Sequence, residues 1–249
     1  MSVASLPMYD WPEVRVETDA LWRALQQALR ARALPAPEIL DRLRESRDVW
    51  RDRDLVLSQT CGMPWRLDLY RHTRLVGTPD YGVDGCRPGY YRSMVVVRAG
   101  DARTTLEAFA GATCAVNGFD SQSGYAALAE LVGRDRCFGD WLETGAHRAS
   151  IDAVAQARGD IAAIDAVTWR LARRFQPQAS KLRVLMTTPP TPGLPFITGK
   201  AHDAETVFAA VTDALAVLPD ATRDALGLHG IVKIPPSDYF AVGTGSLDG

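Results

Sequence analysis

Short apolar segments that are typical of buried strands alternate along this chain with segments that have helical periodicity. The clearest strand signals are Asp54–Ser58, Tyr91–Arg98, Thr113–Val116 and Leu182–Thr187. This alternation predicts an α/β fold with largely parallel sheets. Ligands of such folds bind at the carboxyl ends of strands and at the N-termini of helices. Functional residues are therefore expected where a strand signal gives way to a helix signal.

The N-terminal part of the chain predicts two helices. Thr18 can cap the first, which carries a regular apolar stripe. The second follows Pro35, and its spacing is expected to turn Ile39, Leu40 and Leu43 toward the core.

Two breaks, near residues 85–91 and 187–195, divide the chain into three parts. The second break holds four prolines in nine residues, so it cannot be a helix or a central strand. Three parts with two crossings predict a two-lobed protein whose second lobe is an insertion. We expect lobe one to comprise 1–90 and 190–249 and lobe two to comprise 91–189, with the ligand site between them.

Charge and composition exclude several functions. The 28 basic and 30 acidic side chains give a net charge of −2, whereas a duplex nucleic-acid binder usually carries a basic excess. No apolar run approaches the ~20 residues of a membrane span. The four cysteines and four histidines show no metal-ligand spacing, so we expect no metal and no cofactor. The first residues lack a basic region followed by an apolar one, so we expect no signal peptide in this chain.

The segment from Asn117 to Tyr125 is the most informative. A predicted strand leads into a polar turn with two serines, Ser121 and Ser123, and then into an apolar helix. Hydroxyl groups, a close backbone approach at Gly124 and the free N–H groups of a helix start can together bind an oxyanion without a lysine. The alternative interpretation is that a serine only caps the helix.

Three other segments lie at similar positions. His147 lies at a predicted helix start, and Asp165 ends an apolar strand, where it can accept a hydrogen bond from a ligand. Either residue can instead be a helix cap. Thr60 and Cys61 follow the strand signal at 54–58. Cys61 can be considered as a nucleophile, but no residue pattern places a base beside it, so a packing role is favoured.

Taken in order, these segments resemble the phosphate/phosphite/phosphonate-type substrate-binding proteins of ABC transporters, which have the type II periplasmic-binding-protein fold. The matching stretches are LPMYD (6–10), LSQTCGMP (57–64), YRSMVVVR (91–98), NGFDSQSGY (117–125), GAHRASIDAVAQARGDIAAIDAVTW (145–169) and TTPPTPGLPF (187–196).

The resemblance implies two α/β lobes with two hinge crossings that close around a small phosphonate- or phosphate-like oxyanion. It implies a non-catalytic, periplasmic and monomeric protein that presents this ligand to an ABC transporter permease. The expected ligand-binding residues are Tyr9, Thr60, Cys61, Tyr91, Ser121, Gln122, Ser123, Gly124, Tyr125, His147 and Asp165.

A second hypothesis is also compatible with these residues. The same fold resembles small cytoplasmic enzymes, such as the chorismate dehydratase-like proteins, which bind carboxylates at the equivalent place. In that reading the protein is a cytoplasmic enzyme or sensor acting on a small carboxylate, with Asp165 or His147 as the acid or base. The expected lack of a signal peptide leaves a cytoplasmic location open.

Overall fold

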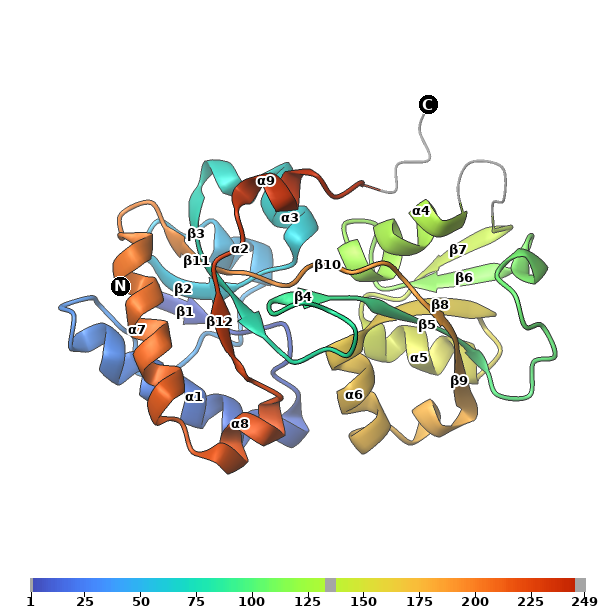
Figure 1. Cartoon of the computed structure of the whole chain (residues 1–249), viewed down its shortest axis with the longest axis horizontal. Coiled ribbons are helices and arrows are strands. Elements are labelled where there is room, and N and C mark those ends of the chain that lie inside the picture. The colour runs from blue at the N-terminus through green and yellow to red at the C-terminus, as the bar shows by residue number, and fades with distance from the viewer. Residues whose placement is uncertain (1, 133–137, 245–249) are drawn as a thin grey trace. The chain divides into compact units, whose positions relative to one another are not determined.

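The computed structural model describes residues 2–132 and 138–244. The chain divides into two compact units, each built around its own sheet (Figure 1). The first unit comprises Met1–Tyr90 and Pro192–Phe240, and the second comprises Tyr91–Thr191 and Ala241–Gly249.

The first unit holds a five-stranded mixed sheet in the order β1-β2-β11-β3-β12. β1 and β2 are parallel, whereas β11 is antiparallel to both β2 and β3. Because β11 follows the return of the chain to this unit, one sheet joins both of the unit's segments. The strands are β1 (Val3–Ser5), β2 (Leu55–Gln59), β3 (Thr73–Asp80), β11 (Phe196–Gly199) and β12 (Gly230–Val232).

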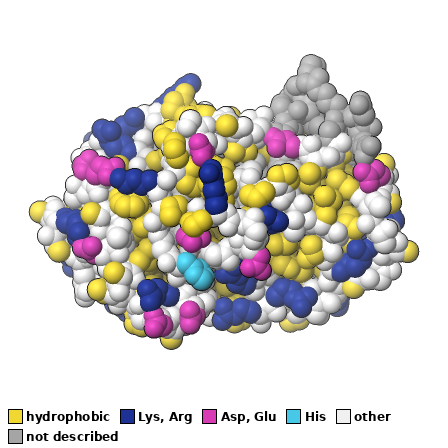
Figure 2. All heavy atoms as spheres, viewed as in Figure 1, with side chains coloured by type: hydrophobic (Ala, Val, Ile, Leu, Met, Phe, Trp, Pro, Cys, Tyr) yellow, Lys and Arg dark blue, Asp and Glu magenta, His cyan; other side chains and the backbone are white. Residues whose placement is uncertain are grey.

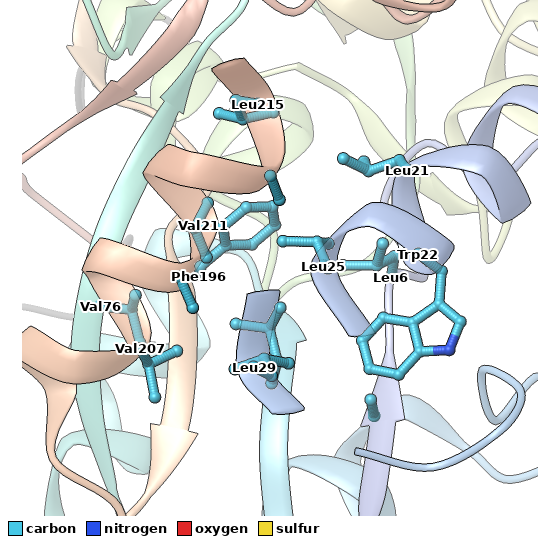
Figure 3. Packing of buried hydrophobic residues seen from close by; sticks show 14 of the residues in the cluster. Leu6, Leu21, Trp22, Leu25, Leu29, Val76, Phe196, Val207, Val211 and Leu215 are labelled. Carbon is cyan, nitrogen blue, oxygen red and sulfur yellow. The ribbon is translucent and has the colours of Figure 1, made fainter. Parts of the chain in front are cut away.

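Two long helices, α1 (Arg15–Arg30) and α7 (Ala204–Val217), pack on one face of this sheet. Figure 3 shows Leu25 and Leu29 of α1 directed toward the side chains of α7, with Phe196 of the sheet among them. Both leucines are fully buried, as the apolar stripe predicts. α1 begins three residues before the expected cap, and Thr18 instead donates from its hydroxyl to the Val14 carbonyl oxygen at 3.2 Å.

Shorter helices complete the first unit. The opposite face of the sheet is covered by a cluster that includes residues of α2, α3 and α9. The prediction of a helix after Pro35 is wrong. The Asp41 side chain accepts hydrogen bonds from the backbone N–H groups of Leu43 and Arg44, and this stabilises a turn there. As a result Ile39 and Leu43 are exposed and only Leu40 is buried. The bounds are α2 (Ser46–Trp50), α3 (Gly62–Leu67), α8 (Asp220–Leu226) and α9 (Pro236–Phe240).

The second unit holds another five-stranded sheet, in the order β7-β6-β8-β5-β9. β6 is parallel to β7 and β8, but β5 is antiparallel to both of its neighbours, so the expectation of largely parallel sheets is wrong. The chain enters this unit through β5 and leaves it through β9 at the same end, which makes these two strands antiparallel. The strands are β5 (Ser93–Arg98), β6 (Thr113–Val116), β7 (Asp140–Glu143), β8 (Ile161–Asp165) and β9 (Leu182–Thr187).

Three helices flank the second sheet. α4 lies on one side of it and α5 and α6 lie on the other (Figure 1). Fully buried side chains such as Val95, Phe109 and Ile161 form the core on the α4 side. The helices are α4 (Ala127–Val132), α5 (His147–Ala155) and α6 (Ala166–Phe175).

The chain passes between the units at β4 (Tyr90–Tyr91) and β10 (Thr191–Pro192), which pair as a two-stranded sheet. Residues 241–244, which were expected in lobe one, group with the second unit. In this segment the Gly243 backbone lies so close to the Glu130 carboxylate of α4 that a Cβ atom would not fit. Residues 245–249 of the expected lobe one lie outside the described residues.

Charged side chains of both signs are interspersed on the face drawn in Figure 2, as the balanced composition leads one to expect. Within residues 2–132 and 138–244, no helix is long and apolar enough to cross a membrane.

Candidate functional site

The serine-containing segment forms a single π-type turn, Gln122–Ala126, between the end of β6 and the start of α4. Ser121 caps it, since its Oγ accepts a hydrogen bond from the Gly124 backbone N–H at 3.0 Å. Ser121, Gln122 and Ser123 are each at most 5 % exposed. Turns of this type are rare and occur frequently at functional sites. The capping alternative is therefore true of Ser121, but it does not account for the buried side chains that follow.

His147 is the first residue of α5, and its imidazole reaches two of the other predicted site residues. Its Nε2 atom lies 3.0 Å from the Ser123 Oγ and 3.5 Å from the Asp165 Oδ2. The structure thus brings together three residues that are far apart in the sequence.

Asp165 serves two purposes with its two oxygens. Oδ1 caps α6 by accepting from the backbone N–H groups of Val167 at 3.0 Å and Thr168 at 2.9 Å. Oδ2 is the oxygen that lies near His147. The cap fixes the carboxylate in position, so both interpretations drawn from the sequence hold at once.

Burial lowers the pKa of His147 below its ordinary value, and the Asp165 carboxylate opposes part of this effect. The imidazole is therefore neutral at neutral pH, with one N–H and one lone pair. The carboxylate beside Nε2 favours the tautomer in which Nε2 carries the proton, which leaves Nδ1 as an acceptor.

This arrangement differs from a nucleophile–histidine–acid triad. In a triad the hydroxyl and the carboxylate contact opposite nitrogens of the imidazole, so that the ring can take a proton from one side while the acid orients the other. Here Ser123 and Asp165 both lie at Nε2, and Nδ1 has no hydrogen-bond partner among the described residues. The geometry fits ligand binding better than activation of the Ser123 hydroxyl.

Several polar atoms at this turn are buried without a hydrogen-bond partner among the residues that the structure describes. They are Oε1 and Nε2 of Gln122, Oδ1 of Asn117 and Nδ1 of His147. Gly124 is part of the same group, because a Cβ atom placed there would overlap the Asn117 amide and come within 3.2 Å of His147 Cε1. Buried polar atoms are nearly always satisfied, so a cluster of exceptions indicates a place where a ligand or ordered water completes the bonding.

Sequence reasoning missed Asn117 and Ser93 as members of this site. The Ser93 hydroxyl donates to the Ser123 carbonyl oxygen at 2.9 Å, and Ser93 faces Asp165 in the β5–β8 register. Asn117 had a usable signal, because it directly follows the predicted strand 113–116. No local sequence pattern indicates Ser93, because only the pairing of distant strands places it beside the turn Gln122–Ala126.

Two predicted tyrosines also lie in the second unit. The ring of Tyr125 makes edge contacts with Phe119 and Trp141, at centroid distances of 5.2 and 5.1 Å. Tyr91 is buried in β4. Ligand contact by these two residues stays a prediction.

The remaining predicted residues, Tyr9, Thr60 and Cys61, belong to the first unit. Tyr9 packs edge-on against Tyr81 at 5.0 Å and lines a cavity of about 30 Å³. Thr60 is fully buried, and its backbone N–H donates to the Pro195 carbonyl oxygen at 3.1 Å. Cys61 precedes α3, and its side chain makes no capping hydrogen bond. Their contact with the same ligand stays a prediction.

Comparison with known proteins gives a family and a set of similar folds. A model of the family described as "ABC transporter, phosphonate, periplasmic substrate-binding protein" matches residues 73–239, which is more than half of the chain. No curated protein matches the sequence.

Three solved structures illustrate the similarity in fold. XAC2383 from Xanthomonas citri bound to chloride ion is 16% identical over 98% of this chain and 96% of that one, with a TM-score of 0.71. The binding protein component of an ABC phosphonate transporter, PA3383 from Pseudomonas aeruginosa, is 14% identical over 96% and 83%, with a TM-score of 0.68. PhnD1 from Prochlorococcus marinus in complex with methylphosphonate is 15% identical over 96% and 94%, with a TM-score of 0.68.

Proposed function

Because the chain belongs to the periplasmic substrate-binding proteins of phosphonate ABC transporters, we propose that it binds a small phosphonate- or phosphate-like oxyanion at the turn Ser121–Tyr125. The family supplies solutes to transporters and is not a family of enzymes. The observation that carries the choice of site is the group of buried, unpartnered polar atoms of Gln122, Asn117 and His147, together with the hydroxyl of Ser123.

The chemistry of the turn suits an oxyanion. A hydroxyl that accepts one hydrogen bond can still donate its own O–H, so Ser121 and Ser123 both offer donors. The Gln122 amide offers an N–H group that is buried and unpartnered among the described residues. Neutral donors in a buried place bind an anion without the desolvation cost of a fixed cation.

Asp165 and His147 set the protonation of the ligand in this proposal. A carboxylate near the site disfavours a fully ionised ligand, unless a proton lies between the two. The neutral His147 can accept a hydrogen bond from an O–H or N–H group of the ligand at Nδ1. The site therefore favours an anion that retains one proton or carries another hydrogen-bond donor.

The finer features of function follow from the resemblance and are part of the same proposal. Tyr9, Thr60, Cys61 and Tyr91 contact the same ligand, and bending at the crossings β4 and β10 couples binding to a conformational equilibrium. The protein is a periplasmic monomer and presents its ligand to a transporter permease. Of the two readings of the sequence, the family match favours the binding protein over the cytoplasmic enzyme or sensor.

Calorimetric titration with methylphosphonate and with phosphate tests the site. We expect the double variant Ser121→Ala/Ser123→Ala to lose binding, because it removes both hydroxyl donors. Ser180→Ala is the matched control, since the exposed Ser180 hydroxyl donates to the nearby Pro177 carbonyl oxygen at 2.7 Å, away from the proposed site. Unchanged affinity in the double variant would overturn the proposed site, and conversion of the ligand detected by mass spectrometry would favour the enzyme reading.

A further inference from the structure

The first unit has a groove of about 510 Å³ that the proposed oxyanion site does not use. β3 forms one side of the groove, and the segment that follows β12 forms the other side. The lining residues are Trp65, Thr73–Thr78, Lys200, Ala204, Glu205 and Lys233–Pro236.

The groove follows the edge of β3 and not one of its faces. Successive side chains of a strand point to opposite faces, so a groove lined by six consecutive residues must run along the backbone. The packing agrees, because Leu75 packs with the cluster on the α3 side and Val76 packs with the cluster on the α7 side. The groove is therefore a gap beside the strand at the level of the sheet.

This edge is open because β12 is short. β12 pairs with Thr78–Asp80 and ends at Val232. The chain then reaches Pro235 and Pro236, which have no backbone N–H, and α9 begins at Pro236. Among the described residues, no strand pairs with the 73–77 part of β3 on the side opposite β11. Open strand edges of this kind accept additional strands.

The charges around the groove select the occupant. Arg74, Lys200 and Lys233 line it, and all three are exposed. Glu205, which pairs with Lys233, is the acidic residue of the lining. Trp65 also lines the groove, and its buried indole N–H has no acceptor among the residues that the structure describes. An extended chain with acidic side chains is complementary to this lining.

We propose that this groove binds an extended acidic segment of a partner protein, which adds to β3 as a strand. The main-chain groups of β3 supply hydrogen bonds, and the three cations select acidic side chains. The slot beside 73–77 is long enough for about five residues of an extended strand. This binding is independent of the oxyanion site, which lies in the second unit.

Fluorescence anisotropy with a fluorescein-labelled peptide, Val-Glu-Val-Glu-Val-Thr, tests the proposal on the full chain. We expect the same peptide with N-methylated backbone amides to bind at least about tenfold more weakly, because it cannot donate main-chain hydrogen bonds to β3. A peptide with Gln in place of Glu should also bind about tenfold more weakly, and added salt should remove this difference.

The matching protein variant is Arg74→Ala/Lys200→Ala, which should weaken binding of the acidic peptide about tenfold and leave methylphosphonate binding unchanged. Arg23→Ala/Lys181→Ala removes two exposed cations elsewhere and serves as the control. Equal binding of the N-methylated peptide, no binding of the acidic peptide, or equal effects of the two double variants would overturn the proposal. So would sedimentation that shows the groove filled by a second copy, with dimers lost in Arg74→Ala/Lys200→Ala.

Discussion

Gln122→Met is the substitution that most directly tests the assignment of the site, because it should raise the stability of the ligand-free protein while abolishing ligand binding. Gln122 is 2 % exposed, and both of its amide atoms are without partners among the described residues. Methionine has a similar length and is unbranched, so it can occupy the same space without polar atoms.

The expected size follows from the cost of an unsatisfied buried polar group, which is about 1–3 kcal/mol. Taking about 2 kcal/mol for the whole amide, the free energy of unfolding should rise by that amount in the ligand-free variant. For a chain of this length, this corresponds to an increase in Tm of about 4–8 °C.

Scanning calorimetry with and without methylphosphonate separates the two effects. In the wild type, ligand at a hundredfold excess over its Kd should stabilise the fold by about 2.7 kcal/mol. In Gln122→Met this ligand-dependent shift should disappear, although the ligand-free Tm is higher.

Gln176→Met is the matched control for this experiment. The Gln176 side-chain amide donates to the Arg148 carbonyl oxygen at 2.9 Å and to the Asp152 carboxylate at 2.8 Å. The same substitution there removes hydrogen bonds that are made, so it should lower stability and leave ligand binding intact. A lower ligand-free Tm for Gln122→Met, comparable to that of Gln176→Met, would refute the reasoning, because it would mean that the Gln122 amide is satisfied without ligand.

Three further expectations follow from the structure. The pKa of buried His147 lies below its value in the unfolded state, so the unfolded state takes up a proton first as the pH falls. The free energy of unfolding should therefore fall as the pH drops below about 6.5. In His147→Gln this part of the pH dependence of the urea midpoint should vanish. Leu40→Ala should cost about 2–5 kcal/mol in urea unfolding, whereas Leu43→Ala should change stability by less than about 0.5 kcal/mol; equal effects would contradict the exposed turn. Ser93→Ala should lower stability by about 1 kcal/mol and weaken methylphosphonate binding, because the Ser123 carbonyl loses its donor; unchanged binding by calorimetry would separate Ser93 from the site.

Local sequence patterns predicted the elements that carry the site with good accuracy. The strand at Thr113–Val116 is confirmed at both ends, and Asp165 both ends β8 and caps α6. These elements combine an apolar run of strand length with a polar residue where the helix begins. Interactions between residues close in sequence therefore determine their bounds.

Patterns failed where side chains or distant strands compete with local preference. The spacing of Ile39, Leu40 and Leu43 is helical, but the Asp41 side chain bonds the backbone and holds a turn. The antiparallel placement of β5 depends on its pairing with β8 and β9, which lie about 70 and 90 residues away. No window of the sequence contains that information.

The same limit explains why the sequence alone left the binding protein and the enzyme both open. Ser123, His147 and Asp165 are compatible with a triad and with a binding site, because the residue types are identical in the two. The difference lies in which imidazole nitrogen each partner reaches, and the start of α5, the end of β8 and the turn after β6 together determine this. Ser123 and Asp165 both lie at Nε2 of His147. The carboxylate therefore does not orient the ring from the opposite nitrogen, as it would in a triad that takes a proton from the serine hydroxyl. Nδ1 has no hydrogen-bond partner among the described residues, and in the proposed function it is the ring atom that contacts the ligand.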